Sequence, residues 1–400
     1  MEEELAREPL SAVRLLELLV REAHALKASD IHLDPSEEYL IARMRLDGAL
    51  QDAYHLPIRI HREMLARLKI LAGLRIDEHQ APQDGRFRFP LKNDAAPVSY
   101  LDIRVSTAPT YYGENAVLRL LSSREGLTTL PSLGLTNSHQ AMIRRALARP
   151  HGLILVTGPT GSGKTSTLYV LMHLLNNRDV SVITIEDPIE YSIDGVNQIQ
   201  ANRRTGLTFA EGLRSILRQD PNVIGIGEIR DQETAALAIH ASLTGHLVLS
   251  TLHTTNAPSA LPRLIDLGIE PYLVASTVSL VIGERLVRKL CTECRIAQKL
   301  SKDQKKLIAE YMPEHSLLGT YYVAPGCEKC DGTGISGRLG LFEVLEVNGL
   351  LREAAGRKAS AQELKALAQD QGMLTLLIDG LRKAEEGLVA IDDVLALAYE

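Results

Sequence analysis

A run of eight residues in the middle of the chain has the types and spacing of a phosphate-binding loop. The segment 158–165, GPTGSGKT, fits the pattern G-x-x-x-x-G-K-[S/T], and the apolar run LILVT at 153–157 precedes it. Glycines let backbone N–H groups fold around phosphate oxygens, and the N-terminus of a following helix adds positive potential. We expect the Lys164 ammonium to reach the β- and γ-phosphates of a nucleotide, and the Thr165 hydroxyl to ligate Mg²⁺. The predicted nucleotide-binding residues are Gly158, Pro159, Thr160, Gly161, Ser162, Gly163, Lys164, Thr165 and Ser166.

Acidic residues follow two strand-like runs downstream of this loop. Glu228 comes directly after NVIGIG at 222–227, and an acid at the carboxyl end of a strand lies where open parallel sheets bind ligands. We predict that Glu228 organises Mg²⁺; a charge at a helix N-terminus is the alternative. The segment TIEDPIE at 184–190 ends a second strand with Glu186 and Glu190, which are candidates for a general base. A solvated acidic loop is the alternative there.

Two histidines flank a further apolar run at 247–251. His246 precedes the run and His253 follows it. A histidine just past a strand end can sense a γ-phosphate by hydrogen bonding, although each histidine taken alone is more often structural.

The four cysteines form two C-x-x-C pairs, Cys291 with Cys294 and Cys327 with Cys330. Four thiolates can close a tetrahedral Zn²⁺ site, and such a site is structural because it has no open position. A redox dithiol and simple buried thiols are the alternatives, but no thioredoxin-like βαβ pattern surrounds either pair. We predict one zinc ion that fixes the segment 291–340.

The composition is that of a globular chain. Its 400 residues suffice for two or three domains, with 45% apolar and 24% charged residues. No apolar run reaches the roughly 18 residues of a membrane helix, and the N-terminal sequence MEEELAREPL is too acidic for a secretory signal. A net charge of −6, the absence of tryptophan and an aromatic content of 4% argue against a nucleic-acid partner. Residues 281–310 nevertheless carry eight Lys or Arg against four Asp or Glu.

Hydrophobic periodicity indicates an α+β N-terminal domain over residues 1–122, then a linker over 123–135. The apolar spacing predicts amphipathic helices at 11–28 and 58–73. The expected strands are 31–33, 39–46, 85–91, 99–105 and 115–121, with a hairpin turn at Asp47-Gly48.

Beyond residue 136, short apolar strands alternate with helices, which is typical of a parallel sheet covered on both faces. The expected strands are 153–157, 181–185, 223–227 and 247–251. The expected helices are 137–149, 164–176, 208–219, 231–243 and 256–267. We predict an α/β fold with a nucleotide-binding core at 136–288, a tetracysteine zinc subdomain at 289–340 and a helical C-terminal subdomain at 341–400.

Together these segments resemble the secretion ATPases, the motors of type II secretion and type IV pilus assembly, over about residues 10–400. In the core, the resemblance rests on GPTGSGKT, TIEDPIE, LRSILRQDPNVIGIGEIRD (213–231) and GHLVLSTLHTTNA (245–257). In the N-terminal domain it rests on ASDIHLDP (28–35), APQDGRFRF (81–89) and DIRVSTAPTYYGENAVLRLL (102–121). The segment CTEC…CEKCDGTGISGRLGLFEVL resembles the tetracysteine subdomain of the assembly-type members.

The resemblance implies a RecA-like P-loop ATPase domain in a homohexameric ring, with ATP and Mg²⁺ between the two domains of each protomer. By motif position, Glu190 matches the family's general base with Glu186 beside it, and Glu228 matches the metal-organising acid. His246 and His253 match the family's His box. The family's phosphate-reaching arginines, some acting across subunits, map onto Arg86, Arg104, Arg214, Arg218 and Arg230. Without the family, each arginine is more often a surface or ion-pair residue.

The resemblance also implies a role. The expected function is an ATP-driven motor that adds pilin or pseudopilin subunits, in the cytoplasm and attached peripherally to an inner-membrane platform protein. The long assembly members carry an additional N-terminal docking domain; because only residues 1–10 precede the matching region, we expect this sequence not to include it. Residue 222 is Asn where the family usually has Asp, and we expect little consequence.

Three alternatives to this role differ in what they require. A pilus-retraction motor shares the chemistry, but the retraction motors lack the cysteine subdomain. A RecA-like nucleic-acid translocase is disfavoured by the acidic charge and the few aromatic residues. A non-hydrolysing, nucleotide-gated scaffold would require the loss of a catalytic acid, and Glu186, Glu190 and Glu228 are all present.

Overall fold

The computed structural model describes residues 11–46, 48–91, 99–121, 129–202, 205–311 and 319–399. The chain divides into two compact units, Met1–Glu125 and Gly126–Glu400. Asp47 of the predicted hairpin turn and residues 123–128 of the predicted linker lie outside the described residues. Among the helices that the structure describes, none has both the length and the apolar character that crossing a membrane requires.

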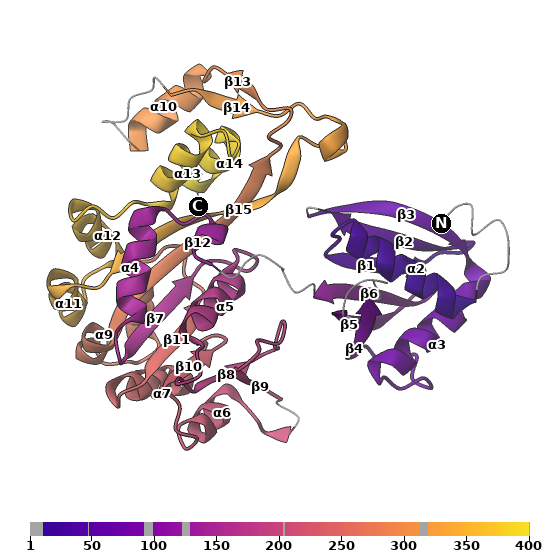
Figure 1. Ribbon diagram of the computed structural model, residues 1–400, viewed down its shortest axis with the longest axis horizontal. Coiled ribbons are helices and arrows are strands. Elements are labelled where there is room, and N and C mark those ends of the chain that lie inside the picture. Colours follow the sequence, from indigo (N-terminus) through magenta and orange to yellow (C-terminus); the bar gives the residue numbers. More distant parts are fainter. Residues whose placement is uncertain are drawn as a thin grey trace. The chain divides into compact units, whose positions relative to one another are not determined.

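The N-terminal unit is an antiparallel sheet with helices packed on one face (Figure 1). Its strands are β1 (Asp30–Pro35), β2 (Tyr39–Leu46), β3 (Ala49–Pro57), β4 (Gln83–Leu91), β5 (Ser99–Thr110) and β6 (Gly113–Leu121), in the order β3-β2-β1-β6-β5-β4. Helix α2 (Ala12–Ala25) begins after Ser11, whose hydroxyl accepts the Arg14 N–H. Helix α3 (His61–Ala72) follows a 3₁₀ turn, η1 (Ile58–Ile60). Because successive strand residues face opposite ways, the apolar half of each strand packs under these helices and the polar half forms the other face.

The C-terminal unit contains the predicted parallel sheet, which confirms the α/β fold class. Its strand order is β15-β12-β7-β11-β10-β8-β9, and every neighbouring pair is parallel except β12 with β15. The strands of this sheet are β7 (Gly152–Thr157), β8 (Val182–Glu186), β9 (Asn197–Gln200), β10 (Val223–Ile226), β11 (Leu247–Leu252), β12 (Val278–Leu290) and β15 (Ile335–Glu346). A small separate sheet pairs β13 (Ile296–Gln298) with β14 (Tyr321–Val323).

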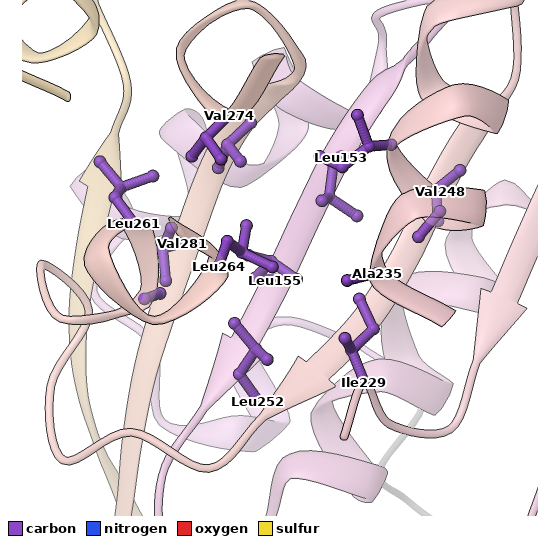
Figure 2. Packing of buried hydrophobic residues seen from close by; sticks show 14 of the residues in the cluster. Leu153, Leu155, Ile229, Ala235, Val248, Leu252, Leu261, Leu264, Val274 and Val281 are labelled. Atoms are coloured by element: carbon purple, nitrogen blue, oxygen red, sulfur yellow. The ribbon is translucent and has the colours of Figure 1, made fainter. Parts of the chain in front are cut away.

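Helices cover both faces of this sheet. Leu153 and Leu155 of β7 belong to one apolar layer, whereas Ile154 and Val156 belong to the other. Figure 2 shows the first layer, with side chains from β7, β11 and β12 packed against side chains from helices α7, α8 and α9. The helices of this unit are α4 (Asn137–Leu147), α5 (Lys164–Leu175), α6 (Phe209–Ile216), α7 (Gln232–Leu243), α8 (Ala260–Asp266), α9 (Pro271–Thr277), α10 (Lys302–Tyr311), α11 (Gly349–Gly356), α12 (Ala361–Asp370), α13 (Leu376–Glu385) and α14 (Ile391–Leu395).

Two long strands were not predicted and change the proposed boundaries. Strand β12 runs without interruption across the predicted boundary at residue 288, and β15 runs across the one at residue 340. Residues 341–346, expected in a helical subdomain, are therefore part of the central sheet. Their pairing partner lies about 60 residues earlier in the chain, and such non-local pairing is invisible to local periodicity.

The predicted linker also differs from the structure at its C-terminal end. Leu130, Leu133 and Leu135 are buried in the core beside α4 and α5, and Pro131–Leu133 forms the 3₁₀ turn η2. Residues 130–135 are therefore part of the C-terminal unit.

A buried ion pair fastens the C-terminal helices to β15. The Asp379 carboxylate on α13 accepts the Phe342 N–H at 2.9 Å and lies 2.6 Å from the Lys383 ammonium. Lys383 in turn donates to the Gly340 carbonyl at 2.7 Å. Oδ2 of Asp379 makes both contacts, and this buried, paired charge fixes where α13 meets the sheet.

Candidate active site

The predicted phosphate loop connects β7 to α5, as its sequence requires. Gly158 and Gly163 both have positive φ, +153° and +107°. A Cβ on Gly163 would lie only 2.1 Å from Glu284 Oε1, so a side chain is excluded there. Lys164 lies along the loop and donates to the carbonyl oxygens of Gly158 at 2.9 Å and Pro159 at 2.8 Å. Burial lowers the pKa of Lys164, while the nearby carboxylates of Glu284 and Glu228 act in the opposite direction.

The loop fits a phosphate group. Ser162 is 3% exposed, and its hydroxyl is buried without a hydrogen-bond partner among the described residues. A buried hydroxyl that lacks a partner is costly unless a ligand supplies one. Thr165, the predicted Mg²⁺ ligand, is exposed in the first turn of α5. The loop thus combines an ammonium group, glycines whose backbone conformation suits a phosphate-binding turn, and hydroxyl groups. A Mg²⁺–nucleotide requires groups of these kinds.

Glu284 is a residue of this site that sequence reasoning missed. It lies on β12, is 2% exposed, and its Oε2 accepts the Thr167 hydroxyl of α5 at 2.8 Å. Its carboxylate therefore backs the loop at Gly163 and the first turns of α5. The only signal in the sequence is the position of Glu284 inside the apolar run VSLVIGERLV. A charge in such a run indicates a buried acid that needs a partner, but it does not identify that partner.

The parallel register brings the carboxyl ends of the neighbouring strands to the same edge as the loop. Ile226 of β10 pairs with Ile185 of β8 and with Ser250 of β11, so the residues that follow these strands lie close together. Glu228 meets His253 there: the His253 Nε2 lies 3.0 Å from Glu228 Oε2. Arg230 Nη2 lies 2.6 Å from Glu228 Oε1. Glu228, Arg230 and His253 are thus assembled within one chain, at the edge that the sequence predicted.

The two candidate bases lie in different environments. Glu186 is 3% exposed, and its carboxylate accepts hydrogen bonds from the hydroxyls of Thr184 and Tyr169 and from the Gln198 amide. Glu190 is half-buried, and its backbone N–H donates to the Tyr169 hydroxyl at 3.1 Å. The sequence could not separate these roles because the partners of Glu186 come from α5 and from β9.

His246 does not lie with the other predicted residues. It precedes β11, whereas His253 follows that strand, so the two are at opposite edges of the sheet, about 20 Å of extended chain apart. Its Nδ1 lies 3.0 Å from the Ala241 carbonyl oxygen, next to the end of α7. The prediction that His246 joins the phosphate site is therefore not supported within this chain.

The remaining predicted arginines are divided between the units. Arg214 of α6 pairs with Glu211 at 2.7 Å and with Glu233, and Arg218 donates to the Arg214 carbonyl at 2.8 Å. In the N-terminal unit, Arg86 of β4 pairs in register with Arg104 of β5. Their predicted contacts with phosphate remain predictions.

The four cysteines come together as predicted. Their Sγ atoms all lie within 4.8 Å of one another, with separations of 3.9 Å for Cys291–Cys327, 3.9 Å for Cys294–Cys330 and 3.7 Å for Cys327–Cys330. Four sulfurs at about 2.3 Å from a tetrahedral Zn²⁺ lie ~3.8 Å apart, whereas a disulfide requires about 2.05 Å. The geometry fits a four-thiolate metal site and free thiols.

Local donors favour ionisation of one thiol of this cluster, Cys330. The N–H groups of Cys327 and Gly334 each lie 3.2 Å from Cys330 Sγ. Burial raises the pKa of Cys330, but these two donors and the neighbouring thiols outweigh it and the pKa is lowered to about 6, whereas burial raises the pKa of Cys294 to about 12. A thiolate at neutral pH is the form that ligates zinc.

The basic run around this cluster is not one surface. Arg285 is buried, Arg288 pairs with Asp393 at 2.5 Å, and Arg295 donates to the Gly387 carbonyl at 2.5 Å. These contacts attach the cysteine segment to the region of α13 and α14, with which it shares an apolar cluster. Arg288 is exposed but paired, and four further exposed basic residues, Lys299, Lys302, Lys305 and Lys306, form what we call the lysine patch.

The segment after His253 is anchored twice. The Thr254 N–H donates to the Thr157 hydroxyl at the end of β7 at 3.1 Å, and the Ala257 N–H donates to Glu343 Oε1 of β15 at 2.5 Å. Burial raises the pKa of the Glu343 carboxyl above its ordinary value, against the opposing hydrogen bonds from Ala257 and Leu376. Glu343 was not predicted, because its strand was not predicted.

A phosphate loop at the carboxyl edge of a parallel sheet, beside an acid and a histidine, defines a P-loop ATPase. Residues 6–396 match the family described as type II/IV secretion system protein. Type II secretion system protein E of Xanthomonas campestris pv. campestris is 44% identical over 97% of this chain and 67% of its own length. Type II secretion system ATPase E of Vibrio cholerae is 42% identical over 97% of this chain and 75% of its own. The type IV pilus assembly ATPase PilB of Myxococcus xanthus is 40% identical over 98% of this chain and 68% of its own length.

The chain therefore belongs to the type II/IV secretion system protein family, and its enzymatic activity is ATP hydrolysis. This confirms the resemblance drawn from the motifs. Solved structures agree on the fold: the ATPase DotB of Legionella pneumophila superposes with a TM-score of 0.70 at 22% identity, and the ADP-bound pilus retraction motor PilT with 0.65 at 24%. Each of the two comparisons covers 98% of both chains.

Glu343 makes the stability of the C-terminal unit depend on pH. Because its pKa is raised in the folded state, its contribution is complete below the ordinary value of 4.5 and is lost as the pH rises through the folded value. Glu343→Gln removes this titration and keeps an oxygen that can accept the Ala257 N–H. We expect the unfolding free energy of the variant, relative to the parent, to increase as the pH rises. Urea unfolding at several pH values measures it, and a difference that stays constant or shrinks contradicts the assignment.

Proposed function

We propose that this chain is the ATP-hydrolysing motor of a homohexameric ring that powers the assembly of pilin or pseudopilin subunits in a type II secretion or type IV pilus-type system. The single observation that carries the proposal is the convergence of the phosphate loop, Glu228 and His253 at one sheet edge in a chain of this family. The names of the relatives, type II secretion ATPase and pilus assembly ATPase, support the assembly direction. The tetracysteine cluster supports the same direction.

In this proposal each residue near the loop has a separate task. Lys164 and the loop N–H groups bind and orient the β- and γ-phosphates. Thr165 and Glu228 hold Mg²⁺, which neutralises phosphate charge when it is bound with ATP. Glu190 takes a proton from the attacking water. The water oxygen bonds to the γ-phosphorus, and the bond between the γ-phosphorus and the β,γ-bridging oxygen breaks. His253 keeps the Glu228 carboxylate oriented, as their 3.0 Å contact indicates.

Five arginines, from both units of the chain, are also given a role in the proposal. Arg86, Arg104, Arg214, Arg218 and Arg230 are proposed to neutralise charge that develops on the transferring phosphoryl group, some of them in trans. An arginine supplied by a neighbouring subunit makes hydrolysis depend on the geometry of the ring. This dependence is how a ring converts hydrolysis into relative movement of its subunits.

The partner is proposed to be an acidic cytoplasmic face of an inner-membrane platform protein, reached by peripheral attachment. The lysine patch at Lys299, Lys302, Lys305 and Lys306 supports this, because it is exposed and close in sequence to the cysteine cluster. A zinc ion held by Cys291, Cys294, Cys327 and Cys330 would fix the segment that carries the patch.

Separating binding from cleavage tests the catalytic assignment. We expect Lys164→Ala to lose nucleotide binding, because the loop loses its only ammonium. Glu190→Gln and Glu228→Gln should bind ATP nearly as the parent does and cleave it about 100-fold or more slowly, because each keeps the shape but not the charge. Single-turnover hydrolysis beside a fluorescent-nucleotide binding assay provides the measurement. Parental turnover in Glu190→Gln would reject Glu190 as the base.

Metal content tests the cysteine site. We expect about one equivalent of zinc per chain in protein purified anaerobically without chelators, and a loss of this zinc in Cys327→Ser. Because the cysteine segment shares its apolar cluster with α13 and α14, the variant should unfold locally there and leave ADP binding within about threefold of the parent. Elemental analysis and calorimetric ADP titration measure both. Zinc-free parent protein would reject the site, as would a Cys327→Ser variant that retains its zinc.

A further inference from the structure

We propose that Tyr169 is a positioning residue for hydrolysis: its hydroxyl ties helix α5, which begins at Lys164, to the segment that carries Glu190. The inference rests on the proposed function, in which Glu190 is the general base. It assigns to Tyr169 and Glu186 a joint role that differs from the general-base role predicted for Glu186 from sequence.

The Tyr169 hydroxyl joins two segments that are distant in the chain. Tyr169 lies on α5, is 1% exposed, and donates to the Glu186 carboxylate at the end of β8. The same oxygen accepts the backbone N–H of Glu190 at 3.1 Å. A phenol has one proton to give and lone pairs to accept with, so a single hydroxyl meets both demands. Burial and the Glu186 charge raise the pKa of Tyr169, so the hydroxyl keeps the proton that it donates.

The surroundings of Glu186 hold its carboxylate in a fixed, buried position. Thr184 donates its hydroxyl to Glu186 Oε1 at 2.6 Å, and the Gln198 amide donates to the same atom at 3.0 Å. Both carboxylate oxygens are therefore engaged, and the residue is only 3% exposed. A general base needs an accessible lone pair within hydrogen-bond reach of the water that it activates. Glu186 is buried and already accepts three hydrogen bonds, so it is poorly accessible to a water, whereas it is well placed to hold the Tyr169 hydroxyl.

The rest of the Glu190 segment is fixed from the same centre. The Gln198 amide also donates to the Tyr191 carbonyl at 3.2 Å, and its oxygen accepts the Ile193 N–H at 2.8 Å. The Tyr191 ring packs edge-on against Tyr169, with ring centroids 4.5 Å apart. The backbone on both sides of Glu190 is thus held relative to the helix that presents Lys164. Displacing a catalytic group by about 1 Å can cost about 100-fold in rate, which gives this connection a catalytic consequence.

Tyr169→Phe removes the connection and keeps the ring. We expect kcat for ATP hydrolysis to fall about 10- to 100-fold while the KM for ATP and the Kd for ADP stay within about twofold. The Tyr321→Phe control removes the same group from another buried tyrosine, in the cysteine segment, whose hydroxyl donates to Glu385 of α13 at 3.2 Å. It should leave kcat unchanged. A merely structural role for Tyr169 would instead weaken ADP binding and lower kcat together.

A double-mutant cycle tests whether Tyr169 and Glu186 act as one unit. If they do, Tyr169→Phe combined with Glu186→Gln should lose little more kcat than the more damaging single change. Multiplicative losses would overturn the joint role. An inactive Glu186→Gln beside a fully active Tyr169→Phe would overturn it as well, and would make Glu186 the base.

Comparison of Tyr169→Phe with Glu190→Gln separates the failure of this inference from failure of the proposed function. Parental kcat in Tyr169→Phe, beside an inactive Glu190→Gln, overturns the inference alone. Parental turnover in Glu190→Gln removes the base that Tyr169 would position, and so overturns both.

Discussion

Burial of the central parallel sheet on both faces is the constraint on which the rest of the structure depends. Alternate residues of β7 enter two separate apolar layers. The side chains along this strand are therefore used in packing and do not contact a ligand. Each fully buried Leu or Ile contributes about 1.5–3 kcal/mol, which polar replacements would forfeit. The groups proposed to contact the nucleotide therefore follow the strand ends, whereas Glu284, in the middle of β12, supports the loop from behind. The parallel register then gathers the phosphate loop, Glu186, Glu228 and His253 at a single edge.

Strand β12 connects this edge to the cysteine cluster. At one point along it, Glu284 backs Gly163 and accepts the Thr167 hydroxyl; at its end, Leu290 directly precedes Cys291. Its antiparallel partner β15 returns from the cysteine segment and supplies Glu343, which holds the backbone after His253. Figure 1 shows β13, β14 and α10 at one end of the C-terminal unit and β8, β9 and α6 at the other. The two long strands give the nucleotide edge and the metal cluster a direct covalent and hydrogen-bonded path.

The sequence predicted those features whose physics is local. The phosphate loop is contiguous, the cysteine pairs have short fixed spacing, and the apolar strands alternate with helices, so each could be recognised from neighbouring residues. Glu186 and Glu190 could not be told apart, because Tyr169 and Gln198, which distinguish them, lie well before and after them. The strand β15 was missed because its pairing with β12 is non-local. His246 was grouped with His253 because both flank one apolar run and match the family's His box, although the six strand residues between them place the pair at opposite edges.

Mapping the metal–nucleotide site on the polypeptide tests the central claim, that one sheet edge forms the hydrolytic centre. Fe²⁺ replaces Mg²⁺ in the ATP complex, and ascorbate with peroxide then generates radicals that cut the backbone close to the metal. The account predicts ATP-dependent cuts within 158–165, 186–190 and 227–230, which mass spectrometry would locate, and their disappearance in Lys164→Ala. Cuts clustered near His246 and Asn222, at the opposite edge of the sheet, or cuts that persist without ATP, would contradict it.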